Sequence, residues 1–438
     1  MIKKTTPLST APYKGVRDFY PRDMAIFNHI TDTMRSVAEQ FGFEEYQTSL
    51  LEPTELYLNK TSAEIVNEQT YTFTDRGDRS VTLRPEMTPS VTRLVAGRRR
   101  ELPLPLKWYS IPNCFRYERP QKGRVREHWQ LNCDIFGDTG VRGEIEIILL
   151  AHEIMKAFGA RDEMFTIKLN NRTILTDTLT RVASDGGYEL DENQTRAILR
   201  IMDRKEKLSP EEYANAMQEA VGAEIGRTLI DAHTPERVGA IMAELPSLQA
   251  FVALQEELHR LGITNIEHST ELVRGFDYYT GLVFEVFDTS GENTRSLFGG
   301  GRYDNLMELF GQEPIPAVGF GMGDTALRDF LETHKLLPSY QSRTTLYIAT
   351  IGETFAGAEY VAQQLRAQDV SVSVNLGTKK LGEQIKQAES LGIEFLIAVG
   401  EDELRSGTFT LKHLPSRSER TVTLDDLAEA LFSFEEHA

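Results

Sequence analysis

The sequence has very little cysteine and no long apolar run. Its only two cysteines, Cys114 and Cys133, are too few for a disulfide framework and do not match a paired zinc-knuckle or CxxC redox spacing. No apolar run of about 18 residues occurs, and residues 1–12 are polar, with no apolar core of a signal peptide. We therefore expect a cytoplasmic protein that does not cross a membrane.

Positive charge is scarce over the chain as a whole. Lys and Arg number 48 against 66 Asp and Glu, which gives a net charge of −18. Taken alone, this charge argues against binding to nucleic acid. Residues 84–126 reverse the balance, because eleven cations face three acids there and the segment carries +8, while the remainder carries −26. The sequence therefore predicts a concentrated basic segment in an acidic protein.

Length and patterning predict three domains, since 438 residues suffice for two to four at roughly 100 to 200 residues each. Apolar residues at helical spacing predict a helix over 26–41. Alternation predicts a hairpin over 71–83 and strands over 104–117, 127–136 and 271–287. Residues 172–261 show mainly helical patterns. We expect an α+β domain over 1–171 and 262–335, interrupted by a helical insertion domain over 172–261.

The pattern changes after a linker at residues 336–339. Apolar strands over 346–349, 370–374 and 395–399 alternate with helical segments over 355–368 and 381–390. This alternation predicts a small α/β domain with a largely parallel sheet over residues 341–438.

A cationic loop joins two of the predicted strands. The segment 115–126 places five cations around a proline and a glycine. Arginine suits phosphate because its planar guanidinium stays charged and makes bidentate contacts. A solvated surface loop is the ordinary alternative, but Arg116 lies in the strand and Gln121 at the loop tip can contact base edges. We therefore weigh a phosphate-binding loop against a solvated one.

Four segments carry a resemblance to a known family. Residues 115–124 (FRYERPQKGR) resemble motif 2 of the class II aminoacyl-tRNA synthetases, in the form typical of the histidyl-tRNA synthetase family. Residues 272–285 (LVRGFDYYTGLVFE) resemble the histidine-specific signature of that family. Residues 300–304 (GGRYD) are similar to a third motif, and residues 82–88 (TLRPEMT) to the family's amino-group-binding segment. The resemblance runs in order over essentially the whole chain.

The resemblance implies a fold and an activity. The fold would be a catalytic domain on an antiparallel sheet, with the helical insertion and a C-terminal α/β anticodon-binding domain, working as a homodimer. The activity would be to join L-histidine to ATP as histidyl-adenylate, releasing diphosphate, and to transfer the histidine to the 3′-terminal adenosine of tRNA(His). Mg²⁺ would be held mainly by the ATP phosphates, so no protein metal site is expected.

The resemblance also implies roles for individual residues. Catalysis would depend on Arg116 and Arg274, because the histidine carboxylate and the α-phosphate repel each other until positive charge screens them. The histidine-binding set would be Glu86, Thr88, Arg116, Gln130, Asp134, Arg274, Tyr278, Tyr279 and Tyr303.

The resemblance also implies which residues bind each part of the substrates. The α-ammonium group would bind Glu86, Thr88 and Asp134, the carboxylate would bind Gln130, and the three tyrosines would line the imidazole pocket. The ATP-binding set would be Arg116, Glu118 and Arg119, and the tRNA acceptor end would contact Gln121 and Arg126. No side-chain nucleophile is needed, because a tRNA ribose hydroxyl attacks the adenylate, and His128 is expected to be structural.

Three positions depart from the family pattern. Ser49 stands where motif 1 has a proline at the dimer interface, and Asp134 stands where many members have Glu. Ala326 replaces the motif 3 arginine that binds the γ-phosphate of ATP. Arg328 lies about 200° further round a helix, so it cannot simply take over that role.

These departures leave a second hypothesis, a non-catalytic synthetase-like regulatory subunit of histidine biosynthesis. That family lacks an anticodon-binding tail and usually the arginine matching Arg274, and both are present here.

Overall fold

The structure is a computed structural model that describes residues 8–58, 69–119, 123–202, 208–232, 235–269, 272 and 278–433. The chain divides into two compact units, Met1–Leu337 and Pro338–Ala438. The first unit carries a large sheet and a small one, and the second carries a five-stranded sheet of its own.

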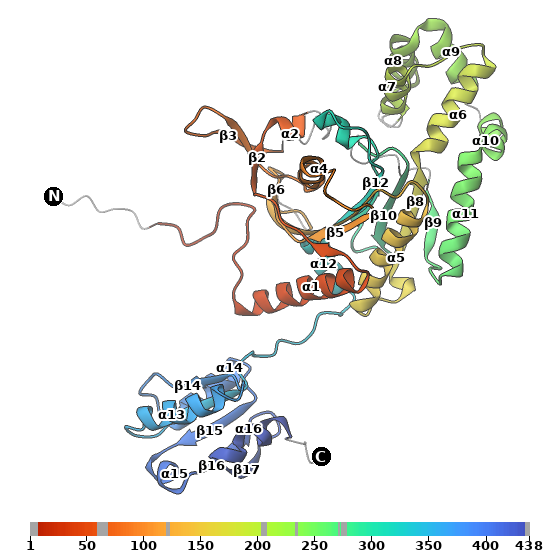
Figure 1. Ribbon diagram of the computed structural model, residues 1–438. Helices are drawn as coiled ribbons and strands as arrows, with labels where there is room; N and C mark the ends of the chain where they lie inside the picture. Colours follow the sequence, from red (N-terminus) through yellow and green to blue (C-terminus); the bar gives the residue numbers. More distant parts are fainter. Residues whose placement is uncertain are drawn as a thin grey trace. The chain divides into compact units, whose positions relative to one another are not determined.

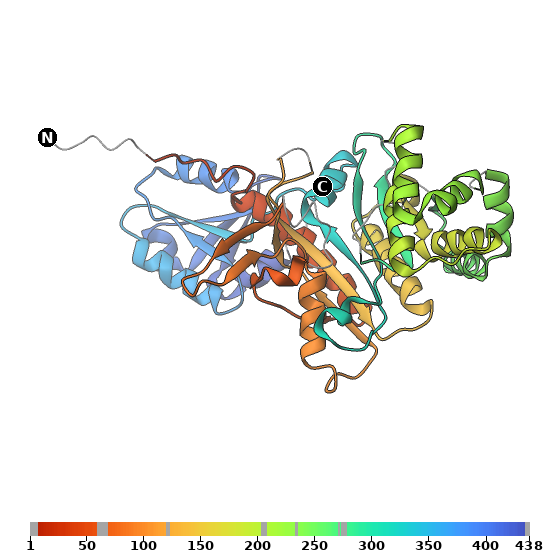
Figure 2. The same ribbon diagram turned by 90° about the horizontal axis from the view of Figure 1, so that it is seen from above.

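A nine-stranded sheet forms the centre of the first unit (Figure 1 and Figure 2). Its order is β1-β5-β7-β12-β11-β10-β8-β9, and β6 pairs with β7. Neighbouring strands are antiparallel except in the pairs β1–β5 and β8–β9, which confirms the predicted antiparallel sheet of an α+β fold. The strands are β1 (Glu44–Glu45), β5 (Leu106–Ser110), β6 (Asn113–Phe115), β7 (Glu127–Phe136), β8 (Phe165–Asn171), β9 (Ile266–His268), β10 (Leu282–Asp288), β11 (Ser296–Arg302) and β12 (Ala317–Gly323).

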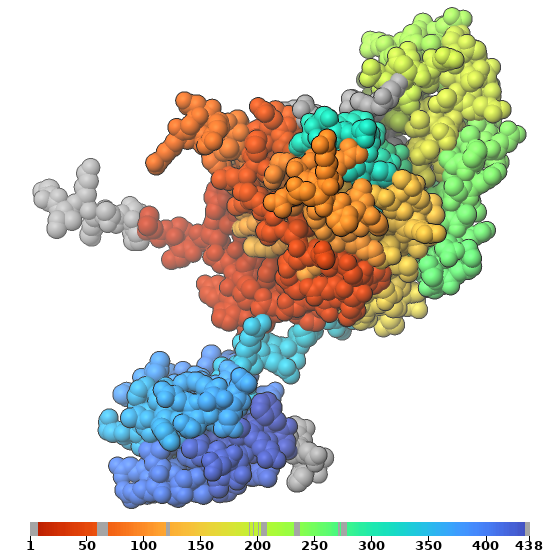
Figure 3. All heavy atoms as spheres, viewed as in Figure 1, coloured from red at the N-terminus to blue at the C-terminus, as the bar shows by residue number. Residues whose placement is uncertain are grey.

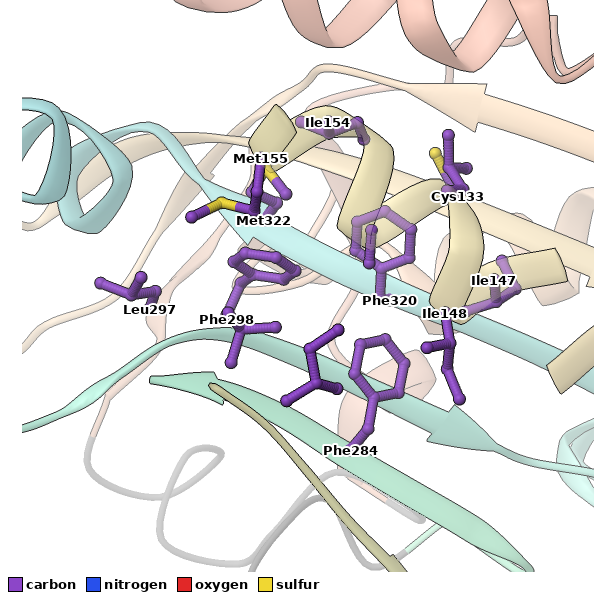
Figure 4. Close-up of a cluster of buried hydrophobic side chains, with 14 of the residues drawn as sticks. Cys133, Ile147, Ile148, Ile154, Met155, Phe284, Leu297, Phe298, Phe320 and Met322 are labelled. Atoms are coloured by element: carbon purple, nitrogen blue, oxygen red, sulfur yellow. The ribbon is translucent and has the colours of Figure 1, made fainter. Parts of the chain in front are cut away.

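Three helices, α1 (Pro21–Gln40), α5 (Arg142–Ala157) and α12 (Asp324–Thr333), pack on one face of this sheet. Figure 4 shows the phenylalanines of three adjacent strands, Phe284, Phe298 and Phe320, beside Ile147 and Ile154 of α5. The helix predicted over 26–41 is confirmed as α1, which lies on this core. Apolar residues on alternate strand positions thus form the main core and leave the other alternate positions for the opposite face.

The opposite face carries smaller elements. They are α4 (Thr88–Gly97), the 3-10 helix η3 (Leu306–Phe310) and a three-stranded sheet of order β2-β4-β3, with β2 (Leu51–Pro53), β3 (Tyr71–Thr74) and β4 (Ser80–Leu83). The hairpin predicted over 71–83 is confirmed as β3–β4, in which Thr74 pairs with Ser80. The first unit also contains the short helix α2 (Glu55–Leu58) and the 3-10 helix η1 (Asp162–Met164).

In the part of the chain that the structure describes, six α-helices follow β8, as the helical patterns predicted. They are α6 (Arg172–Asp185), α7 (Glu192–Met202), α8 (Pro210–Val221), α9 (Ala223–Ala232), α10 (Pro235–Glu244) and α11 (Pro246–Arg260). Helices α6 to α9 share a small apolar core, whereas Phe251 and Leu258 of α11 pack into the main core. In Figure 3 the yellow and green helices form a lobe at one side of the first unit. The bounds of an insertion domain at 172 and 261 stay a prediction.

No single helix in the described part of the chain is long and apolar enough to span a membrane. One pair bent by 73°, Arg237–Glu244 with Pro246–Arg260, meets the requirement by length and composition only.

The second unit has the sheet order β14-β13-β15-β16-β17. Its elements are β13 (Leu346–Thr350), α13 (Phe355–Arg366), β14 (Val372–Val374), α14 (Leu381–Ser390), β15 (Phe395–Val399), α15 (Glu401–Ser406), β16 (Thr408–His413), β17 (Ser418–Thr423) and α16 (Leu424–Phe432). The three predicted strands pair in parallel, as expected. The antiparallel strands β16 and β17 were not predicted, because their polar and charged residues give a weak apolar pattern.

Candidate active site

Two central strands of the large sheet build the floor of a pocket. On β7, Leu131, Cys133 and Ile135 point into the main core, so Gln130 and Asp134 point to the opposite face. The neighbouring strand β12 presents glycines there, with Gly319 opposite Asp134 in the register. The alternation along β7 therefore brings predicted histidine-binding residues to one face of the sheet.

Glycine on β12 leaves room for these side chains. A Cβ atom at Gly321 would lie 2.5 Å from Nε2 of Gln130, which is closer than a real Cβ contact. A Cβ atom at Gly319 would likewise collide with Oδ1 of Asp134. The glycine-spaced sequence of β12 is thus explained by the side chains of the adjacent strand, which lie across its surface.

The pocket above this floor has a volume of about 170 Å³. It is small enough to suit an amino acid more closely than a large ligand. Most residues that the sequence assigned to histidine line it, namely Glu86, Thr88, Arg116, Gln130, Tyr278, Tyr279 and Tyr303. The structure therefore brings together residues separated by more than 200 positions in the sequence.

Two tyrosine–carboxylate pairs organise the pocket. The Tyr278 hydroxyl donates to Oε2 of Glu86 at 2.9 Å, and the Tyr303 hydroxyl donates to Oδ1 of Asp134. All four residues are buried. The ring centroid of Tyr278 lies 5.0 Å from that of Tyr279 and 5.8 Å from that of Tyr303, so the three aromatic rings form one wall.

Burial shifts the titration of both pairs. It raises the pKa of Asp134 to about 7, and the hydrogen bond from Tyr303 opposes that rise. It also raises the pKa of Tyr278 well above its usual range, together with the nearby charge of Glu86. The second oxygen of Asp134, Oδ2, is buried without a hydrogen-bond partner in the described part of the chain. Asp134 is not itself among the residues that line the pocket, and it adjoins the pocket through its bond to Tyr303, which does line it.

The motif 2 segment enters the pocket through Arg116. Its Nε donates to the backbone oxygen of Pro85 at 2.9 Å, which fixes the guanidinium beside the segment that carries Glu86. Two ATP-assigned residues follow it, Glu118, whose backbone N–H donates to the Arg116 oxygen at 2.8 Å, and the exposed Arg119. Among the described residues, Arg116 is thus the cation that lines this pocket.

The residues assigned to the tRNA acceptor end differ in their surroundings. Arg126 is 8% exposed, its guanidinium lies 4.0 Å from the ring centre of Tyr117, and it donates to the Glu118 oxygen and the Tyr13 hydroxyl. In this arrangement Arg126 supports the loop from inside. Gln121 and the proposed catalytic Arg274 lie outside the described residues.

Glu285 was not predicted as a pocket residue from the sequence. This side chain lies on β10 and lines the pocket, and burial raises its pKa to about 7. The signal was present, because a single acid inside the apolar strand LVFEVFD must either face a polar site or be costly to bury. Asn132 of β7 also lines the pocket and follows the same alternation as Gln130 and Asp134.

The basic segment contributes less exposed charge than its count suggested. Arg84 is 3% exposed and donates to the backbone oxygens of Asn113 and Thr48 at 2.9 and 3.1 Å. Arg93 pairs with the buried Glu52 at 2.9 Å. These cations stabilise the fold, so the net charge of the segment overstates what is available to a nucleic acid.

Histidine and cysteine side chains near the pocket have no sign of a chemical role. Burial, with the nearby cations Arg116 and Arg17, lowers the pKa of His128 to about 3, so this imidazole is neutral at physiological pH. Both cysteines are buried, and burial raises the pKa of Cys114 to about 11. No group of three potential ligands for a metal ion occurs among the described residues.

The structure shows the surroundings of Ala326 and Ser49, two of the residues that depart from the family pattern. Ala326 lies in the first turn of α12 and lines a second cavity. Arg328 pairs with Glu332 at 2.9 Å and lies 3.6 Å from Asp23 of α1. The Ser49 hydroxyl accepts from the Leu51 backbone at 3.3 Å.

Comparisons with known proteins identify the family of the chain. The family model "Histidyl-tRNA synthetase" matches residues 15–327, and the model "Anticodon binding domain" matches residues 345–433. A histidine–tRNA ligase from Leptospira biflexa is 41% identical over 436 residues, covering 98% of each chain. One from Haloarcula marismortui is 36% identical over 425 residues, covering 94% of this chain and 95% of the relative.

A solved structure supports the fold. The crystal structure of histidyl-tRNA synthetase from a Nostoc species superimposes with a TM-score of 0.75 at 22% identity, over 98% of this chain and all of the other. The extent of the family match and the identity to these relatives lead to one conclusion. The chain belongs to the histidyl-tRNA synthetase family.

Proposed function

We propose that this protein is a histidine–tRNA ligase. It joins L-histidine to ATP, forming histidyl-adenylate and diphosphate, and then transfers histidine to the 3′-terminal adenosine of tRNA(His). The observation that carries the proposal is a pocket lined by Arg116, Glu86 and three tyrosines, in which Tyr278 holds Glu86 and Tyr303 holds the buried Asp134 beside the lining. Such a pocket offers acceptors for a cationic ammonium and for ring N–H groups, and a cation for a carboxylate.

Histidine would lie along β7, with its carboxylate at Gln130 and its ring at Asp134. These two residues are four positions apart, which is about 13 Å along a strand. Asp134 is bonded to Tyr303 within the aromatic wall, at the end of the pocket distant from Gln130. We therefore assign Asp134 to an imidazole N–H, through Oδ2, in place of the ammonium role that the resemblance implied.

The α-ammonium group would then be bound at the other carboxylate. Glu86 and Thr88 line the pocket at the start of α4, and Tyr278 holds the Glu86 carboxylate by a hydrogen bond. Selectivity follows because an amino acid without ring nitrogens would leave the buried Oδ2 of Asp134 without a hydrogen-bond partner. An unpaired buried polar group is costly, which is how such a site rejects isosteres.

Activation requires the histidine carboxylate to attack the α-phosphorus of ATP, and the diphosphate then leaves. Both reactants are anionic, so a fixed guanidinium must reduce their repulsion and stabilise the negative charge of the transition state. Arg116 is held beside the pocket for this role, and Arg274 shares it in the proposal. Glu118 and Arg119 would contact ATP, and Mg²⁺ would be bound mainly by the nucleotide phosphates.

Transfer would use a tRNA ribose hydroxyl as the nucleophile, with Gln121 and Arg126 assigned to the acceptor end. Because Arg126 is buried against Tyr117, its part would be to shape the motif 2 loop that meets the tRNA. The second unit would bind the anticodon. The protein would act in the cytoplasm as a homodimer.

The regulatory-subunit hypothesis is not favoured. The anticodon-binding match covers residues 345–433, which a regulator without that tail would lack. The relatives that match nearly the whole chain are named as histidine–tRNA ligases.

Exchange of labelled diphosphate into ATP tests the proposal. The purified protein should catalyse this exchange only when L-histidine is present, and should charge tRNA(His) but not other tRNAs. Histidine binding measured by calorimetry without any exchange would support the regulator and refute the enzyme. Arg116→Lys is the sharpest variant, because it keeps the charge but loses the planar contacts, and should lower the exchange rate while leaving the fold intact.

A further inference from the structure

A second cavity lies beside the histidine pocket. Its volume is about 630 Å³, and it is lined by the start of β11, by Arg295 just before that strand, and by Ala326 of α12. Leu297 lines this cavity, while Gly299, two residues further along β11, lines the histidine pocket. At about 3.3 Å per residue, the two sites are within about 7 Å of each other along that strand.

We propose that Arg295 binds the terminal phosphates of ATP in this cavity. The inference rests on the proposed function and adds a residue that neither the motifs nor the resemblance identified. ATP with its α-phosphate at Arg116 would extend its β- and γ-phosphates away from the histidine pocket. The adjacent cavity offers an arginine on its wall.

Arg295 differs from Arg124, which also lines the cavity, and from Arg17 and Arg328, which pair with acids of α12. Arg124 pairs with Glu118 at 3.0 Å, and Arg17 pairs with Asp324 at 2.8 Å. Arg328 is held by Glu332. Within the described ranges, Arg295 is exposed and has no ion-pair or hydrogen-bond partner, so its donors can reach a ligand without first breaking a contact.

The backbone before Arg295 is anchored. Asn293 donates to Asp288 at 2.6 Å and to the Thr333 hydroxyl at 3.3 Å, and His334 contacts Asp288 at 2.9 Å. These contacts fasten the β10–β11 turn to the end of α12, the helix that carries Ala326. The turn and the helix therefore hold the two walls of the cavity together, and Arg295 can occupy the space that the small side chain of Ala326 leaves.

The charges in the cavity favour a specific contact over a general field. Glu292 and Asp329 line the cavity with Arg124 and Arg295, so the two acids balance the two cations. The lining residues together therefore carry no net positive charge that would attract a triphosphate. Affinity must come from direct guanidinium contacts, which are charge-assisted and bidentate.

The test is Arg295→Ala in the diphosphate exchange assay. The KM for ATP should rise about 10- to 100-fold, while the KM for histidine and the melting temperature stay unchanged. A non-hydrolysable histidyl-sulfamoyl-adenosine, which lacks the β- and γ-phosphates, should bind as tightly as to the unsubstituted protein. Arg328→Ala is the matched control and should leave the KM for ATP within about twofold.

Two further variants sharpen the result. Arg295→Lys should recover only part of the ATP affinity, because a point charge does not make the bidentate contact. Adding Ala326→Arg to Arg295→Ala should restore much of it, since that side chain enters the same cavity from the other wall.

Different failures have different meanings. An unchanged KM for ATP in Arg295→Ala would overturn the role of Arg295, as would equal weakening of ATP and the adenylate analogue. No exchange by the unsubstituted protein would instead refute the proposed function.

Discussion

Replacing Tyr303 by Phe tests whether Asp134 binds the histidine ring as a carboxylate. The substitution removes the hydroxyl that donates to Oδ1 and leaves a buried carboxylate with neither oxygen hydrogen-bonded. Burial already raises the pKa of Asp134 to about 7, and the lost hydrogen bond was opposing that rise. The protonated form of Asp134 should therefore become more populated at neutral pH. A protonated carboxyl is a weaker acceptor for the N–H of the histidine ring than a carboxylate.

The size of the effect follows from the strength of the bond. A hydrogen bond to a charged group contributes about 1.5 to 3 kcal/mol. At about 1.36 kcal/mol per pH unit, its loss should move the pH midpoint for histidine binding upward by about one to two pH units. At pH 7 the ionised fraction of Asp134 should fall from about one half to between about one tenth and one hundredth, so the KM for histidine should rise about 5- to 50-fold.

The assay is the KM for histidine in diphosphate exchange from pH 7 to pH 9. Free imidazole is mostly neutral over this range, so the titration of the substrate ring does not obscure the result. The Tyr303→Phe variant should approach the unsubstituted protein as the pH rises. Tyr109→Phe is a matched control, because it also removes a tyrosine donor to a carboxylate, Glu39 at 2.8 Å, but outside the pocket.

Two results would refute this reasoning. A KM increase that is the same at every pH would mean that the hydroxyl itself contacts the substrate and that Asp134 does not titrate near neutrality. A midpoint shift of equal size in Tyr109→Phe would mean that the effect is transmitted through the fold.

Three other perturbations have defined outcomes. Gly321→Ala should lower kcat/KM for histidine about 10- to 100-fold in the exchange assay, because the new Cβ would lie 2.5 Å from Gln130 and displace it. Arg302→Ala should lower the free energy of unfolding in urea by about 3 to 5 kcal/mol, because it leaves the buried Glu144 unpaired. Glu285→Gln should raise that free energy by about 2 to 3 kcal/mol at pH 8, since burial raises the pKa of Glu285 to about 7 and its charged form is costly.

Controls separate these effects from general damage. Gly97→Ala, where nothing lies within 4 Å of the new Cβ, should leave kcat/KM unchanged. For Glu285 the sign is explicit: its folded pKa is above the usual 4.5, so the unsubstituted protein loses stability as pH rises from about 4.5 to 7. Glu285→Gln should remove that decline. If the Glu285→Gln variant lost as much stability between pH 5 and pH 8 as the unsubstituted protein, Glu285 would not be the group responsible.

The local elements could be predicted because their signals are contained in short stretches of sequence. The helical spacing before Gly42, the turn between β3 and β4, and the strand–helix alternation after residue 345 each gave the observed element. Two features were not predicted. The polar strands β16 and β17 have a weak apolar pattern, and Glu285 is one acidic residue within an apolar strand.

The family, and the residue types that a histidine and ATP site needs, could be inferred without a structure, because motif residues keep their spacing within a segment. The sequence could not determine which acid each tyrosine holds. Tyr278 meets Glu86 across 192 positions, and Tyr303 meets Asp134 across 169. Nor could it distinguish cations that are buried, such as Arg84, from one that is exposed, such as Arg295. Only the tertiary structure decided these points, since burial and pairing depend on contacts between distant segments, and the same contacts shift the pKa of Asp134 to about 7.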